Sequence, residues 1–498
     1  MTDFDVVEAT VDEIHGAYES EELSCAELVD RYLERIKTYD RNGPELNGMV
    51  RVNPAARDRA EELDEQFRQS GEFSGPLHGI PVLLKDQGET SDIKTTFGST
   101  AFEDYQPEAD ATIVHNLRDA GAVILAKTNM PDWASTWFGY SSVLGRTKNP
   151  YALDRDPGGS SSGTAAGIAA NLGTIGIGED TGGSIRLPAS FTGLCGIRVT
   201  TGLISRTGFS PLVSFQDTPG PLTRTVKETA TLLDVLVGYD PEDPFTAATT
   251  LADVDGSYVD HLDQNGLDGA RLGVLRDAFG DEDDSRCAPV NELVDGAIDA
   301  MSEEGAEIVD PVEIPDFETF IDESMLYVLL SKSELDSFFF DRPDAPVNSV
   351  EELYESGQYH EMLELFESIA KEGPDDPETV PEYWEALAKQ DSFKRALLNT
   401  FAQHDLDAIV CPNVRTLPPT ARALRDGDWS PPRNPLIASQ TRSPAMSVPA
   451  GVTDEGLPVG IELIGKPHHE ARLIELAYAY EQSVDPRVSP DIAPTLSE

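Results

Sequence analysis

Two clusters of glycine and serine lie close together in the sequence and constrain its fold more than any other feature. The first is Gly158-Gly-Ser-Ser-Ser-Gly163, and the second ends the run Gly178-Glu-Asp-Thr-Gly-Gly-Ser184. The residues between them predict a small-residue helix, Gly163–Asn171, and a short strand, Thr174–Gly178. Glycines in such numbers let backbone amides approach a bound group closely. We therefore expect a ligand-binding turn on either side of this helix and strand.

Elsewhere short apolar runs alternate with helical stretches, which is typical of an α/β fold. Since there is no internal repeat and no low-complexity linker, the 498 residues predict one large domain. An acidic, irregular connection is expected at 239–265. The other expected strands are Ile80–Leu84, Ala122–Lys127, Arg271–Leu275, Ala408–Cys411, Ala445–Val448 and Val459–Ile464, with a turn at Asp454-Glu-Gly joining the last two and helices at Thr112–Ala120 and Glu470–Gln482.

Two regions are expected to be mainly helical. Within residues 1–70, helix-start signals stand at Thr10-Val-Asp-Glu and Ser24-Cys-Ala-Glu, the second of them a capping box. We expect this N-terminal region to pack on the outside of a core domain, 71–498. Residues 316–404 give the second helical region, with prolines and acids at the breaks.

The net charge of −53, from 90 acidic and 37 basic residues, is spread along the chain. Such a surface repels phosphates and anionic lipids, so nucleic acid and membrane partners are not expected. The scarcity of lysine and the excess of acids resemble proteins from high-salt cytoplasm. The acidic start and the absence of a 20-residue apolar run predict neither export nor a membrane span.

The four cysteines are far apart, with no paired spacing and no accompanying histidines. Neither a disulfide framework nor a zinc site is indicated, and the chain is expected in a reducing cytoplasm without metal or cofactor. His468 and His469 lack a third ligand at a recognisable spacing, so we expect them to begin the last helix or to face solvent.

Thr181-Gly-Gly-Ser184 sets unhindered amides beside a hydroxyl, as an oxyanion hole requires around a nucleophile. With Ser160 placed 24 positions earlier, the whole stretch Gly158–Ala189 resembles the signature of the amidase signature family. The resemblance extends to three further segments, and it covers most of the chain outside about 315–435. These segments are Gly79-Ile-Pro-Val-Leu-Leu-Lys-Asp86, Ala126-Lys-Thr-Asn-Met-Pro131 and the hairpin from Pro444 to Gly465.

The resemblance implies a central mixed β-sheet covered by helices on both faces, a substrate pocket shaped by the variable region at about 315–435, and an amidase that acts on a small-molecule amide. It implies a triad in which Ser184 is the nucleophile, Ser160 a bridging serine after a cis peptide bond, and Lys85 the base. The amides of Thr181, Gly182, Gly183 and Ser184 would form the oxyanion hole, with Ser161, Asp180 and Arg186 in support.

The chemistry of these residue types is consistent with those roles. A serine hydroxyl is a poor nucleophile until a base removes its proton, and a lysine serves as that base only when burial leaves it neutral. Lys85 ends the apolar run Ile80–Leu84, so its stem is expected to be buried. Trp133 and Trp137 could wall the acyl pocket or pack in the core, and packing is favoured.

The sequence has three other interpretations. The run Gly159–Gly163 also matches a nucleophile elbow with Ser161 as nucleophile, but the proline-broken loop before it disfavours this.

Within the family, the glutamine-hydrolysing component of the aminoacyl-tRNA amidotransferase carries an acid about a dozen residues before the proline matching Pro444. In this chain the nearest acid is Asp428, which favours a stand-alone amidase. A non-catalytic scaffold has no use for the retained triad. A homodimer is left open.

The charge gives a first prediction. Self-repulsion destabilises the folded state at low ionic strength, where the Debye length is about 30 Å at 0.01 M, and is screened at 1 M, where it is about 3 Å. The melting temperature is therefore expected to rise between these two salt concentrations. An unchanged melting temperature in calorimetry would contradict the assignment to high-salt cytoplasm.

Overall fold

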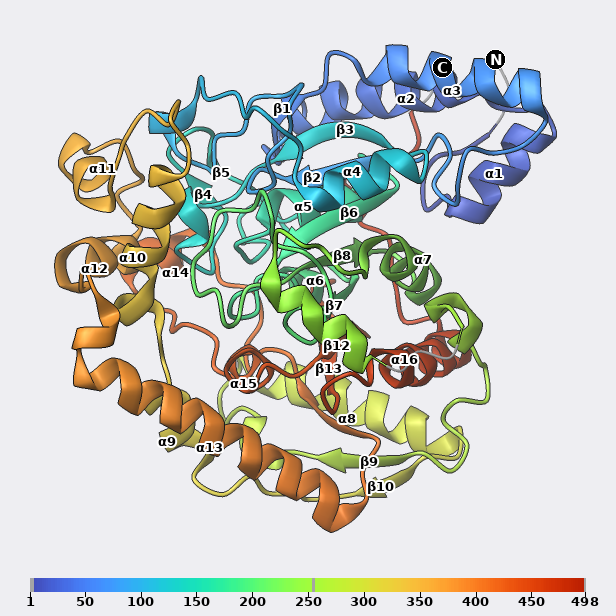
Figure 1. Cartoon of the computed structure of the whole chain (residues 1–498). Helices are drawn as coiled ribbons and strands as arrows, with labels where there is room; N and C mark the ends of the chain where they lie inside the picture. The colour runs from blue at the N-terminus through green and yellow to red at the C-terminus, as the bar shows by residue number, and fades with distance from the viewer. Residues whose placement is uncertain (1–3, 253–255, 497–498) are drawn as a thin grey trace.

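The framework of the molecule is one mixed β-sheet, seen through the middle of Figure 1. The computed structural model describes residues 4–252 and 256–496. Within them the sheet has eleven strands in the order β1-β3-β2-β6-β8-β7-β12-β13-β11-β9-β10. The strands are β1 Met49–Val52, β2 Pro81–Lys85, β3 Val123–Thr128, β6 Ile175–Glu179, β7 Cys195–Arg198, β8 Pro219–Thr223, β9 Arg271–Val274, β10 Glu307–Val309, β11 Ala408–Pro412, β12 Ala445–Val452 and β13 Pro458–Ile464.

The sheet has a parallel part and an antiparallel part. Strands β3, β2 and β6 run parallel, whereas β8, β7, β12 and β13 form an antiparallel block. The predicted C-terminal hairpin is present, since β12 pairs with β13 around Gly456 at φ 77°. All of β2, β3, β6 and β7 is buried, as strands covered on both faces require.

Helices cover both faces of the sheet. On the central strands α5 and α6 pack against each other, while α7, α8 and α16 form a second contiguous set. The predicted fold class, one α/β domain with a helix-covered mixed sheet, is confirmed. These helices are α5 Ser162–Ala169, α6 Arg186–Phe191, α7 Val226–Leu236, α8 Ala288–Glu303 and α16 Glu470–Val484, with α4 Thr112–Asp119 beside β3.

The N-terminal helices α1 (Val11–Glu19), α2 (Cys25–Arg35) and α3 (Ala56–Ser70) lie at one edge of the sheet (Figure 1). Both predicted helix starts are confirmed as capping boxes, at Thr10 and Ser24. Helix α2 packs on α3, and α3 packs on β3. At the end of α2, Arg35 donates to the carbonyls of Ala493 and Pro494, which ties the C-terminal segment to this edge.

A layer of helices, coloured gold and orange in Figure 1, covers one side of the molecule. It has its own apolar cluster, which includes Phe97, Phe102 and Trp133 besides residues of the helices. The helices predicted at 316–404 are thus confirmed. They are α9 Phe317–Glu323, α10 Tyr327–Phe340, α11 Val350–Ser356, α12 Glu364–Glu372 and α13 Pro381–His404, followed by α14 Ala421–Asp426 and α15 Pro435–Thr441.

Strand β8 was not expected from the sequence. It reads Pro219-Gly-Pro-Leu-Thr223, and proline and glycine are ordinarily depleted in strands. It forms because β6 and β7 pair with it on either side. No helix in the described ranges combines the length and the apolarity that a membrane span requires.

Gly163 gives a prediction about packing. A Cβ atom at this position would collide with the backbone of Gly48 and of Asn129, which are not free to move. We expect Gly163→Ala to destabilise the protein by roughly 1–3 kcal/mol or more, seen as a lower urea midpoint. As a control, Gly16→Ala in α1 meets open space and is expected to stabilise by about 0.4–1 kcal/mol. Equal midpoints for the two variants would contradict this account.

Candidate active site

The candidate site begins where two parallel strands end side by side. Lys85 is the last residue of β2 and Glu179 the last of β6, and Leu84 is in register with Ile177. Lys85 Nζ donates to Ser160 Oγ at 2.8 Å, to the Glu179 carbonyl at 3.1 Å and to Glu179 Oε2 at 3.2 Å. The lysine side chain has no exposed surface. The sheet thus places the predicted base against the predicted bridging serine.

The two Gly/Ser clusters meet at the backbone. The peptide bond between Gly159 and Ser160 is cis, as the resemblance implied. Ser161 N donates to the Ser184 carbonyl at 3.2 Å, and Ser161 Oγ accepts from Glu179 N at 3.2 Å. Ser161 therefore joins the first cluster to the second, and its hydroxyl is occupied by the backbone of β6.

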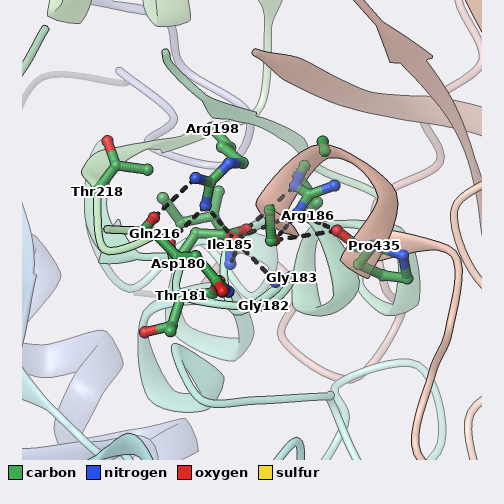
Figure 2. A network of polar contacts seen from close by, with 12 residues as sticks. Asp180, Thr181, Gly182, Gly183, Ile185, Arg186, Arg198, Gln216, Thr218 and Pro435 are labelled. Carbon is green, nitrogen blue, oxygen red and sulfur yellow. Dashed lines mark hydrogen bonds and ion pairs between the residues drawn. The ribbon is translucent and has the colours of Figure 1, made fainter. Parts of the chain in front are cut away.

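Asp180 holds the second cluster in place, as Figure 2 shows. Its carboxylate accepts from Gly183 N at 2.8 Å and from Ile185 N at 3.1 Å. The same carboxylate pairs with Arg186 Nε at 3.1 Å and with Arg198 Nη1 at 3.2 Å. The predicted pairing of Asp180 with Arg186 is present, and Arg198 is a partner that the sequence did not reveal.

The electrostatics of this network keep Asp180 charged. Burial alone would raise the pKa of its carboxyl, but the guanidinium groups of Arg186 and Arg198 hold that pKa below its usual range. Arg186 also pairs with Glu462 of β13 and donates to the Pro435 carbonyl at 2.8 Å. The loop is therefore fixed to the sheet and to α15 by fully buried charges.

Three amides of the loop are free to face a ligand. Gly183 N is taken by Asp180, whereas in the described chain the N–H groups of Thr181, Gly182 and Ser184 have no acceptor. Trp137 Nε1 donates to the Gly182 carbonyl at 2.9 Å, which orients that peptide. A Cβ atom at position 182 would collide with the Tyr327 hydroxyl, so a larger residue there would displace the Tyr327 side chain.

A small cavity opens beside Ser184, whose side chain is one of its walls. The two tryptophans differ in whether they line this cavity. Trp137 lines it, with its ring 5.7 Å from that of Tyr327, whereas Trp133 is buried in the core 5.0 Å from Phe97. Packing is thus confirmed for Trp133 only. The lining residues are all uncharged: Ala134, Thr136, Trp137, Thr181, Ser184, Leu212, Tyr327 and Leu365.

Besides Arg198, Glu179 is a member of the site that was not predicted from the sequence. Burial lowers the pKa of the Lys85 ammonium, while the carboxylate of Glu179 opposes that shift. Burial likewise raises the pKa of Glu179 to about 7, against the effect of Lys85. The sequence showed an acid directly after the predicted strand Thr174–Gly178, but not that this strand lies beside the lysine strand.

Other candidate groups lie outside this constellation. Among the described residues no cluster of three or more His, Cys, Asp or Glu side chains could hold a metal ion. His468 and His469 precede α16, where partial burial lowers the pKa of both rings. Asp428 is 80% exposed and lies 3.7 Å from Arg286, away from the cavity.

Comparisons with known proteins agree with this geometry. The family model for the amidases matches residues 27–474. The chain is 33% identical over 494 residues to the A component of the glutamyl-tRNA(Gln) amidotransferase of Thermoanaerobacter pseudethanolicus, covering 95% of this chain and 96% of that protein. The peptide amidase of Stenotrophomonas maltophilia superimposes with a TM-score of 0.86 at 34% identity, over 98% of this chain and 99% of that one.

A second solved structure, the A component of the glutamyl-tRNA(Gln) amidotransferase of Thermotoga maritima, superimposes with a TM-score of 0.76 at 26% identity over 99% of each chain. The chain belongs to the amidase signature family and is an amidase-type hydrolase.

Proposed function

We propose that this protein is a stand-alone amidase that hydrolyses a carboxylic acid amide through an acyl intermediate on Ser184. The observation that carries the proposal is the 2.8 Å hydrogen bond from the buried Lys85 amine to Ser160, on a chain whose family hydrolyses amides. The cavity beside Ser184 and the free loop amides support it.

In the proposed mechanism, neutral Lys85 accepts a proton from Ser160, which in turn accepts the proton of Ser184. The Ser184 oxygen then attacks the amide carbon and forms a tetrahedral intermediate. The N–H groups of Thr181, Gly182 and Ser184 stabilise its oxyanion, and Asp180 holds the intervening amide of Gly183.

Proton transfer then proceeds in the reverse direction, from Lys85 through Ser160. As the C–N bond breaks, the nitrogen takes the proton back from Ser160 and leaves as ammonia or an amine. Water attacks the acyl-Ser184 ester with Lys85 again as base, which releases the carboxylate and restores the serine. No step needs a metal ion.

The lining of the cavity indicates the substrate class. Trp137, Leu212, Tyr327 and Leu365 offer apolar and aromatic contacts, and none of the lining side chains is charged. We therefore propose an uncharged acyl group in preference to free glutamine, because the ammonium and carboxylate of glutamine require charged partners that these side chains do not offer. The likeness to a peptide amidase adds C-terminal peptide amides to the candidates.

The triad gives a direct prediction. Ser184→Ala, Ser160→Ala and Lys85→Ala are each expected to lower kcat/KM by on the order of 10³-fold or more, and double variants are expected to lose no more than single ones. The reason is that the three residues form one proton-transfer unit. Steady-state kinetics on folded variants measures this, with Ser162→Ala as a neighbouring control for the loss of a buried hydroxyl.

A fluorophosphonate probe identifies the nucleophile without a known substrate. It is expected to label the wild type at Ser184 and to leave Ser184→Ala unlabelled. Labelling at Ser161, or amide hydrolysis by Ser184→Ala at the wild-type rate, would restore the nucleophile-elbow interpretation.

The glutamine-hydrolysing component of an amidotransferase is the second candidate, because relatives named as amidotransferase components match nearly the whole chain. A substrate panel in high salt separates the two. We expect the purified chain alone to hydrolyse aliphatic, aryl or peptide C-terminal amides with apolar acyl groups, and to leave glutamine intact. Glutamine hydrolysis only with partner proteins would favour the second candidate, and no turnover of any amide would favour a scaffold. The high-salt cytoplasmic setting and a homodimer stay predictions.

A further inference from the structure

The proposed triad chemistry gives no role to Glu179, a buried ionisable group that contacts Lys85. Glu179 contacts Lys85 Nζ through its carbonyl and through Oε2, at 3.1 and 3.2 Å. Its other carboxylate oxygen, Oε1, lies 3.2 Å from Thr181 Oγ1, beside the loop amides. The Glu179 side chain is only 1% exposed, so neither water nor salt shields it from the lysine. Glu179 thus contacts the amine of Lys85 in addition to the contact that this amine makes with Ser160.

A fully buried lysine needs such a partner. Burial in a low-dielectric site destabilises the ammonium form, and taken alone it would make Lys85 a weak base that attracts the Ser160 proton poorly. An anion at 3.2 Å acts in the opposite direction. The balance of the two effects determines at which pH the amine is neutral and how strongly it then binds a proton.

The other charged groups around Lys85 and Glu179 already have interaction partners of their own. Asp180 is neutralised by Arg186 and Arg198. On the next strand, Lys127 pairs with Asp86 at 3.1 Å.

From the loop before β8, Asp217 accepts from Thr181 Oγ1 at 2.6 Å and from the amides of Leu212 and Val213. From α10, Tyr327 faces the pair with a phenol whose pKa burial raises, so it stays neutral. Glu179 is therefore the one carboxylate among these described neighbours that contacts the Lys85 amine.

We propose that Glu179 is a positioning residue that acts through Lys85: its carboxylate holds Nζ against Ser160 and sets the pH above which Lys85 can activate the serines. This inference rests on the proposed function, because it assigns Lys85 as the base. No bond is made or broken at Glu179.

The sign of the effect follows from electrostatics. Replacing the carboxylate by an amide removes the anion that stabilises the Lys85 ammonium, so the pKa of Lys85 falls further. In Glu179→Gln the acid limb of the pH profile is therefore expected to move to lower pH, by about 1–2 units. Because the amine is then a weaker base, the rate on the high-pH plateau is expected to fall by roughly tenfold.

The experiment measures the rate of fluorophosphonate labelling at Ser184 between pH 4.5 and 10, for the wild type and Glu179→Gln. This readout needs no substrate. The control is Glu228→Gln in α7, which removes another fully buried carboxyl outside the site and is expected to keep the wild-type profile. If Glu179→Gln does not fold, Glu179→Asp replaces it. Its carboxylate is retained one methylene further from Nζ, so a smaller shift in the same direction is expected.

The outcomes separate the two proposals. A uniform loss of labelling at every pH, with an unmoved acid limb, would assign Glu179 a merely structural role and overturn the inference. A limb displaced to higher pH would overturn it as well. If the wild type is not labelled at Ser184 at any pH, the proposed function itself fails, and the inference falls with it.

Discussion

The structure depends on one buried carboxylate, that of Asp180. It orients the loop amides on one side and binds two guanidinium groups on the other. Through Arg186 the same network reaches Glu462 on β13 and the Pro435 carbonyl at the start of α15. Removal of one partner from such a network leaves an uncompensated buried charge, which costs about 3–5 kcal/mol. Parts of the chain that are distant in sequence are thereby fixed around Ser184.

The sheet supplies the second half of the arrangement. Because β2 and β6 are parallel neighbours, their carboxyl ends bring Lys85 and Glu179 into contact without any help from loops. A loop would hold a lysine less rigidly, and proton transfer depends on sub-ångström positioning. The proposed base, Lys85, thus lies in the sheet, while the proposed nucleophile, Ser184, lies on a turn that the hydrogen bonds of Asp180 hold in place.

How much was predictable follows from the range of the interactions involved. The signals for helix starts at Thr10 and Ser24 are local, and the sequence predicted both starts. Strand β8 was missed because its pairing partners, and not its own residues, make it a strand. In the site, the Gly/Ser clusters and the lysine strand were recognisable from their motifs. The boundary between the N-terminal region and the core at residue 70 stays a prediction. Glu179, Arg198 and the roles of the two tryptophans required strand order and packing, which a single sequence does not contain.

The walls of the cavity come from two separate apolar cores. Ser184 and its loop rest on the core of the central sheet, whereas Tyr327 and Leu365 belong to α10 and α12, which pack around a different cluster. Additivity holds best between sites that share no partners. Substitutions in the helical layer can therefore reshape the pocket with little effect on strand β2, which carries Lys85 and packs in the other cluster. Such a division lets substrate preference evolve, or be engineered, at helical positions while the machinery for breaking the C–N bond stays unchanged.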